Sequence, residues 1–164
     1  MDLTALTERM IAYFAGDPRR IQHFLKVHSL ARLIALQEGL APSEQTIVEM
    51  AALVHDCGIK PAEETYGSCS GKLQEQEGPA VARDLLSSFT CPSEVMERVC
   101  FLVGHHHTYD AIDGADYQIL VEADFLVNLY EDAASPAAIR TAYDRIFRTK
   151  TGRTLCRTMF GMDV

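Results

Sequence analysis

Apolar residues recur every three to four positions along most of the chain, the period of an α-helix with one buried face. The first such stretch covers residues 3–14. Asp17-Pro18, an N-cap residue followed by proline at the first helical position, predicts the start of a second helix. We expect this helix to extend to residue 38 and to end at Gly39, because glycine readily adopts the left-handed conformation that closes many helices.

Further apolar periods predict helices over residues 43–54, 74–89, 93–107, 116–130 and 136–149, with a short last helix over 154–160. Ser43 is expected to cap the first of these helices, and Gly152 is expected to interrupt the chain before the last. The period disappears over residues 57–73 and 108–115, which are predicted to be loops, and long loops are often functional. No segment alternates as a strand does. We therefore predict an all-α, single-domain bundle of about six to eight helices over residues 1–164.

One apolar run ends in two adjacent polar groups. Residues 50–54 are apolar, and the chain then places His55 beside Asp56 before Gly58 and Pro61 interrupt the helical pattern. Burying either polar group without a partner costs several kcal/mol. A divalent metal ion would be a partner for both, which makes this pair the centre of a predicted site.

Three other polar side chains stand in places that suit metal ligands. Asp124 lies in the apolar middle of its predicted helix, His106 lies at the end of another, and His23 lies inside the second helix. Imidazole nitrogen and carboxylate oxygen together suit iron, manganese, zinc and similar ions. The sequence therefore predicts that separate helices bring these groups to one metal.

Composition is that of an ordinary globular protein. The chain has 164 residues, of which 48% are apolar and 23% are charged, enough for one domain with its own core. Five cysteines form no Cys-x-x-Cys pair, which favours reduced thiols in a cytosol. The first 14 residues do not resemble a signal peptide, and no apolar run is long enough to span a bilayer. We therefore expect a cytoplasmic protein with no membrane partner.

The charge of the chain limits its partners. A net charge of −8 argues against binding to a nucleic-acid polymer. It is compatible with a small phosphorylated substrate, which needs only a local basic pocket. Homo-oligomers are also compatible with this composition.

The order His…His-Asp…His…Asp on an all-α chain resembles the HD-domain metal-dependent phosphohydrolases. The matching segments are RIQHFLKV (20–27), AALVHDCG (51–58), EGPAVA (77–82), VGHH (103–106) and EAD (122–124). The resemblance covers about residues 20–130, and the helices over 135–160 are expected to pack on this core. The spacing from His106 to Asp124 is most similar to that of the branch that hydrolyses dinucleoside polyphosphates. By the same resemblance, His105 and His107 orient His106, touch substrate or face solvent.

Two histidines could correspond to the first metal ligand of the family. The family pattern has an apolar residue four positions after this histidine and a glycine at the end of the same helix. Val27 and Gly39 satisfy that pattern for His23. His28 lies five residues further on, away from that helix face. We therefore assign the first ligand to His23 and treat His28 as secondary.

One position departs from the family pattern. The branch with two metals usually has a histidine before Gly-Pro, where this chain has Glu77 before Gly78-Pro79. Either a second ion binds His106 and Glu77, or Glu77 holds a water molecule beside a single ion. In both cases the resemblance places the main ion on four residues, namely His23, His55, Asp56 and Asp124. The expected cofactor is one or two divalent transition-metal ions (Fe, Mn, Co, Ni or Zn), with Mg also compatible.

The resemblance implies hydrolysis of a phosphate ester or anhydride of a small metabolite, with a nucleotide favoured, by metal-activated water. Asp56 or Glu77 would accept the proton of that water. The candidates for binding the substrate phosphate are basic residues, namely Arg20, Lys60 and Lys72.

Two other functions use the same residues. One is a di-iron oxygenase of the same superfamily, which would activate dioxygen instead of water. The other is a metal-stabilised helical signalling module without catalysis.

Overall fold

The computed structural model describes residues 2–162, and within this range the chain forms helices and no strands. In chain order the helices are α1 (Leu3–Tyr13), α2 (Pro18–Glu38), α3 (Pro42–Val54), the 3-10 helix η1 (His55–Gly58), α4 (Ile59–Tyr66), α5 (Gly71–Leu86), α6 (Ser93–Val103), α7 (Ala115–Glu131), α8 (Pro136–Arg145) and α9 (Lys150–Met159). The all-α helical bundle predicted from the sequence is confirmed.

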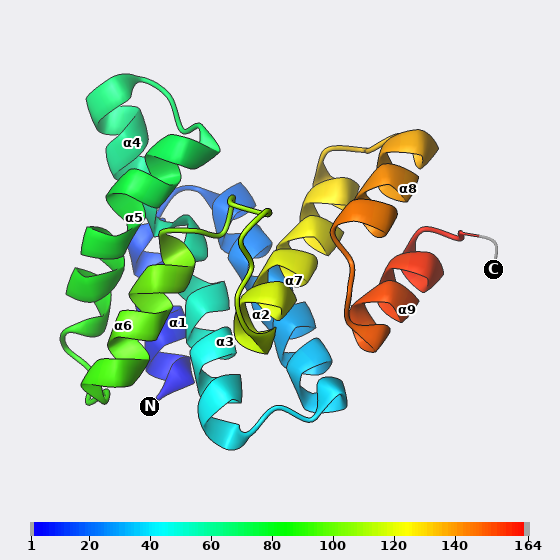
Figure 1. Ribbon diagram of the computed structural model, residues 1–164. Helices are drawn as coiled ribbons and strands as arrows, with labels where there is room; N and C mark the ends of the chain where they lie inside the picture. Colours follow the sequence, from blue (N-terminus) through cyan, green and yellow to red (C-terminus); the bar gives the residue numbers. More distant parts are fainter. Residues whose placement is uncertain (1, 163–164) are drawn as a thin grey trace.

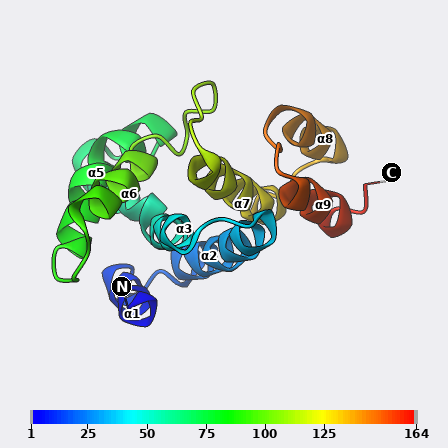
Figure 2. The same cartoon turned by 60° about the horizontal axis from the view of Figure 1, so that its bottom comes forward.

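Helices α2, α3 and α7 form the centre of the bundle, and each of the three packs against the other two (Figure 1). Helix α1 covers α3 on one side, and α6 packs against α3 with α5 beside it. Helices α8 and α9 lie at the opposite end of the molecule, where α9 contacts α2 and α7 (Figure 2). Most of the predicted ligands therefore lie on these three central helices or at their ends.

Two of the central helices are buried on nearly all sides. Every side chain from residue 48 to residue 54 in α3 is buried, as are most side chains of α7. A helix that is apolar around its whole circumference is stable only inside the core. The polar groups on these helices, Glu122 and Asp124 among them, are therefore carried into the interior and need partners there.

Residues 57–73, predicted to be a loop, are mostly helical, because η1, α4 and the first turn of α5 fall within them. Only Ile59 and Ala62 are buried in α4, and two buried positions leave no visible period in the sequence. Pro61 does not prevent this helix, because it lies in the first turn, where the backbone N–H has no partner within the helix. Gly67 ends α4 in the left-handed conformation, with φ 65°.

Two other predicted helix ends are wrong by a few residues. Ala41, not Ser43, is the N-cap of α3, and its backbone N–H donates to the Glu44 carboxylate (3.1 Å). Helix α6 ends at Val103, so the histidines at 105–107 lie in the turn that follows it. Outside a helix, the three imidazole rings need not follow the 100° spacing of helical side chains and can point in different directions.

Two glycines allow α5 to cross η1 at close range. A Cβ atom on Gly58 would overlap the carbonyl oxygen of Gln74 and would lie 2.8 Å from the backbone nitrogen of Gly78. A Cβ atom on Gly78 would lie 2.6 Å from Cγ1 of Val103. Both positions are therefore closed to larger residues, and the crossing holds η1 in place against α5 and α6.

Helix α8 ends at Arg145, four residues before the predicted end at residue 149. The Arg148 guanidinium donates to the carbonyl oxygens of Asp144 (2.9 Å) and Arg145 (2.6 Å). These bonds take up carbonyl groups that a longer helix would have used, and the chain turns toward α9.

Gly152 was predicted to interrupt the chain before the last helix, and this prediction is wrong. The residue lies inside α9. The buried Glu122 carboxylate accepts hydrogen bonds from the backbone N–H groups of Arg148 (2.6 Å) and Thr149 (2.9 Å) and from the Thr149 hydroxyl. A Cβ atom at position 152 would overlap Oε2 of Glu122. Glycine is therefore required here to leave room for a buried carboxylate that joins α7 to the start of α9.

We expect Gly152→Ala to destabilise the protein, because the added methyl group displaces the Glu122 carboxylate from its backbone donors. The cost should be about 2 kcal/mol, typical of an overpacked interior, which lowers the melting temperature of a chain of this size by roughly 4–8 °C. Thermal unfolding followed by circular dichroism measures it. Thr154→Ala, at an exposed position of the same helix, is the control and should change the melting temperature little. Equal melting temperatures for wild type and Gly152→Ala would contradict this packing.

Candidate metal centre

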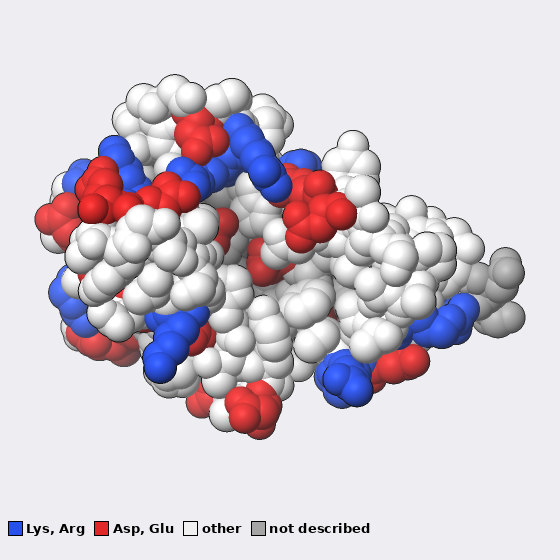
Figure 3. All heavy atoms as spheres, turned by 90° about the horizontal axis from the view of Figure 1, so that it is seen from above, with Lys and Arg blue, Asp and Glu red and all other residues white. Residues whose placement is uncertain are grey.

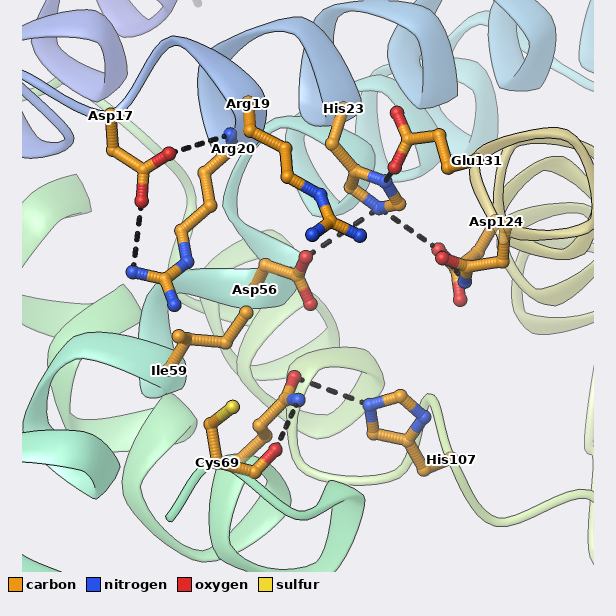
Figure 4. A pocket seen from close by; sticks show the side chains of 12 residues that line it. Asp17, Arg19, Arg20, His23, Asp56, Ile59, Cys69, His107, Asp124 and Glu131 are labelled. Atoms are coloured by element: carbon orange, nitrogen blue, oxygen red, sulfur yellow. Dashed lines mark hydrogen bonds and ion pairs between the residues drawn. The ribbon is translucent and has the colours of Figure 1, made fainter. Parts of the chain in front are cut away.

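Three of the predicted ligands, His23, Asp56 and Asp124, line one pocket (Figure 4), and the fully buried His55 lies against them. His23 comes from α2, the adjacent His55 and Asp56 come from η1, and Asp124 comes from α7. Nε2 of His23 lies 3.1 Å from Oδ1 of Asp124 and 3.3 Å from Nε2 of His55. Oδ2 of Asp56 lies 3.5 Å from both of these imidazole nitrogens. The four side chains thus surround one point: the ligand atoms of His23, His55 and Asp56 all lie within 4.8 Å of one another, and Oδ1 of Asp124 lies beside both imidazole nitrogens.

The other nitrogen of each imidazole fixes its tautomer. Nδ1 of His55 lies 2.9 Å from the carbonyl oxygen of Ala52, which can only accept a hydrogen bond. Nδ1 of His23 lies 3.0 Å from a carboxylate oxygen of Glu131. Both Nδ1 atoms therefore carry a proton, so each imidazole, when neutral, would present the lone pair of its Nε2 to that point. A neighbouring carboxylate or carbonyl orients metal-bound histidines in the same way.

The charges at this point require a cation. Burial alone lowers the pKa of His55, but the charge of Asp56 and the hydrogen bond that His55 donates to Asp124 outweigh it and raise the pKa to about 9. Burial raises the pKa of Asp124, but the bonds from His23 and His55 hold it well below its ordinary value. Two facing lone pairs between two carboxylates therefore attract positive charge, either a proton or a metal ion. The donor set fits a divalent transition metal such as Fe, Mn, Co, Ni or Zn.

His106 provides a second, adjacent donor. Its side chain is buried (1% exposed), Nδ1 donates to the carbonyl oxygen of Val103 (2.8 Å), and Nε2 has no hydrogen-bond partner among the described residues. This nitrogen lies 3.6 Å from Oδ1 of Asp56, the oxygen opposite the one that faces His23 and His55. Asp56 can therefore be shared between two neighbouring ion positions. An unpaired buried nitrogen is costly, and a second cation would satisfy it.

His107 faces the same pocket and not solvent. Its Nε2 lies 3.2 Å from Oε1 of Gln74, and its Nδ1 lies 3.2 Å from the Tyr109 hydroxyl. Burial, followed by the neighbouring His106, lowers the pKa of His107 to about 4, so the ring is neutral at pH 7. Its imidazole forms part of the pocket wall above the predicted ligands.

The pocket has a volume of about 480 Å³ and is lined by twelve residues, namely Asp17, Arg19, Arg20, His23, Asp56, Ile59, Cys69, Gln74, His107, Asp124, Asn128 and Glu131. Sequence reasoning missed several of these. Asn128 donates to Oδ1 of Asp124 (2.9 Å) and Glu131 contacts His23. These two residues follow Asp124 at intervals of four and seven, so they share its helix face. That spacing could have identified them. Gln74 reaches the pocket from the start of α5, and Cys69 from the segment between α4 and α5, where its carbonyl oxygen accepts a hydrogen bond from Gln74 (2.8 Å).

The structure does not bring Glu77 to the site. Its carboxylate accepts hydrogen bonds from the Tyr66 hydroxyl (2.9 Å) and from the Gln76 side chain (3.0 Å), and it does not line the pocket. The reason lies in the packing of α5, where Gln74 and Gly78, one turn apart, face η1. Glu77 lies on an adjacent face, so His106 and not Glu77 supplies the additional donor.

The three predicted phosphate-binding residues are placed differently from one another. Lys60 stands 5.4 Å above the ring of Tyr13 and lines a neighbouring hollow, and Lys72 is exposed outside the pocket. Arg20 lines the pocket, but its guanidinium is bound to Asp17 (3.0 Å) and Glu63 (2.6 Å).

His28 is turned away from the metal centre. Its Nε2 lies 3.1 Å from the Glu49 carboxylate, which Arg32 also approaches. The structure thus places His23, and not His28, at the point where the other candidate ligands meet.

Comparison with known proteins identifies the family. Residues 20–146 match the family described as the HD domain, so the chain belongs to this family. The fold is similar to that in the crystal structure of a predicted HD superfamily hydrolase from an uncultured Thermotogales bacterium. The TM-score is 0.69 and the identity 24%, over 96% of this chain and 84% of the other. No curated protein matches the chain significantly.

No helix within residues 2–162 has the length and hydropathy needed to cross a membrane.

We expect His55→Ala and Asp124→Ala to abolish metal binding, because each removes one of the converging donors. Metal content of the purified full chain, measured by elemental analysis after Mn²⁺ loading and desalting, tests this. His28→Ala is the matched control and should retain the metal. Retention of metal by both His55→Ala and Asp124→Ala would show that the centre lies elsewhere.

Glu131→Ala should weaken metal binding without removing a ligand. The change frees Nδ1 of His23, so its tautomer and orientation are no longer fixed, and affinity should fall about 10- to 100-fold. Competition with a chromogenic chelator measures the affinity. Asp132→Asn alters the neighbouring exposed carboxylate and should leave the metal affinity unchanged. The role of Glu131 would be disproved by equal affinities for Glu131→Ala and wild type.

Proposed function

We propose that this protein is a metal-dependent phosphohydrolase that cleaves a phosphate ester or anhydride of a small metabolite, with a nucleotide the favoured class. The observation that carries the proposal is the convergence of two imidazole nitrogens and two carboxylate oxygens at the base of a pocket with two arginines at its wall. Membership of the HD-domain family and the description of the Thermotogales protein as a hydrolase support it.

When bound, a divalent ion supplies charge that polarises a phosphoryl oxygen and lowers the pKa of water. His23, His55 and Asp124 would hold the ion, and Asn128 would orient the Asp124 carboxylate. Asp56 is the most exposed of the four candidate ligands, and its side chain lines the pocket. We therefore assign to Asp56 the acceptance of a proton from the attacking water, a role for which Glu77 is too remote.

Two neighbouring features bear on the number of ions and on the type of reaction. The position of His106 beside the second oxygen of Asp56 favours a second ion there. A two-ion site would also suit the di-iron oxygenase. Basic side chains at the pocket wall favour hydrolysis, because their charge favours an anionic substrate such as a phosphate.

The test is phosphate release by the full chain loaded with Mn²⁺ or Co²⁺, measured on a panel of nucleotides, dinucleoside polyphosphates and sugar phosphates. Asp56→Asn should lower kcat by about 100-fold or more on the best substrate. Glu77→Gln, which changes a carboxylate outside the pocket, should retain activity. Metal-loaded protein that releases phosphate from no compound would overturn the proposal. Oxygen consumption by the iron-loaded protein would then indicate the oxygenase, and its absence the signalling module.

A further inference from the structure

We infer that Arg19, a residue that sequence reasoning did not single out, is the side chain that binds the substrate phosphate. This inference rests on the proposed function, because it names a specificity-determining residue of the same pocket. Arg19 lies in the first turn of α2, one turn before His23, and lines the pocket. Figure 4 shows its side chain extending from α2 among the other residues that line the pocket.

The guanidinium of Arg19 is available to a ligand. Its side chain is 79% exposed, and its only ion pair among the described residues is with Asp132, at 4.0 Å and with that side chain 70% exposed. An exposed pair at this distance contributes little, about 0–1 kcal/mol. An arriving phosphate would therefore displace a weak partner.

Arg20, the arginine predicted from the sequence, is engaged instead. Asp17 lies 3.0 Å and Glu63 lies 2.6 Å from its guanidinium, and both pairs are partly shielded from solvent. These contacts join the start of α2 to α4. Arg20 is thus a structural residue of the pocket wall, and recruiting it to a phosphate would break two closer ion pairs.

The charge distribution of the pocket leaves this role to Arg19. Besides the ligands Asp56 and Asp124, the lining of the pocket includes the acids Asp17 and Glu131. Seen from above, acidic side chains lie inside the hollow and basic side chains lie at its rim (Figure 3). Arg20 pairs with Asp17 and Lys26 pairs with Glu131, and a divalent ion would balance Asp56 and Asp124. Arg19 is therefore the cation of the lining that is left to attract an anionic substrate. Lys26 cannot take its place, because its ammonium group donates to Glu131 (2.6 Å).

The chemistry of the guanidinium suits this role. Its planar fork can donate two parallel hydrogen bonds to two phosphoryl oxygens. The remaining oxygen atoms would then face the ligand cluster beneath. Arg19 thereby selects compounds that present a phosphate group over neutral compounds of similar size.

The experiment is calorimetric titration of inorganic phosphate into the full chain loaded with Mn²⁺. Arg19→Met should weaken phosphate binding about 10- to 100-fold, the usual worth of a hydrogen-bonded pair with a charged group. Arg19→Lys should recover part of this loss. Asp132→Asn should strengthen binding about twofold, because it removes the competing partner of Arg19. Arg32→Met, on the same helix with a 56% exposed side chain outside the pocket, is the control and should bind as wild type does.

Unchanged phosphate affinity in Arg19→Met, or no phosphate binding by the wild type at millimolar concentration, would overturn the inference. We expect Arg20→Met to lower the melting temperature and to retain phosphate affinity. A loss of phosphate affinity in Arg20→Met but not in Arg19→Met would also overturn the inference. Arg19-dependent phosphate binding without hydrolysis of any ester would overturn the proposed function alone. Hydrolysis that is insensitive to Arg19→Met would overturn this inference alone.

Discussion

Two imidazole nitrogens lie 3.3 Å apart in the interior of this protein, and both point their lone pairs at the same place. Two carboxylates, Asp56 beside His55 on η1 and Asp124 on α7, face the same place. Such groups repel one another unless positive charge lies between them. The family's metal-site character, the raised pKa of His55 and the proposed chemistry all follow from this one electrostatic constraint.

The scaffold holds these groups together against their repulsion. The Ala52 carbonyl and the Glu131 carboxylate accept hydrogen bonds from the outer nitrogens of the two imidazoles, and Asn128 donates to Asp124. The close crossing at Gly58 and Gly78 fixes η1 against α5. The centre is therefore preformed before any ligand binds, because each donor is oriented by a hydrogen bond or by packing outside it.

The pocket above the centre separates two kinds of arginine. Arg20 stabilises the wall through Asp17 and Glu63, whereas Arg19, its neighbour in sequence, is left with a weak partner on the surface. Adjacent residues on a helix point about 100° apart, so one can be structural while the other meets the ligand. The proposed selectivity for phosphate depends on this division and on the acidic groups that surround it.

The sequence by itself determined the all-α class, the helices with long apolar periods and the candidates His23, His55, Asp56 and Asp124, because these depend on local pattern and on polar residues in apolar surroundings. It did not determine the helix α4, which is too short to show a period. Through the family resemblance it also pointed to Glu77 beside the metal and to Arg20 as a residue that binds the substrate phosphate.

Only the tertiary structure decided the roles of Glu77, Arg20 and Gly152. Glu77 is turned toward Tyr66 by the packing of α5, Arg20 is held by a carboxylate on another helix, and Gly152 makes room for the carboxylate of Glu122. In each case the deciding partner is distant in sequence. A local pattern records which face of a helix is buried, but not which side chain from another helix meets it there.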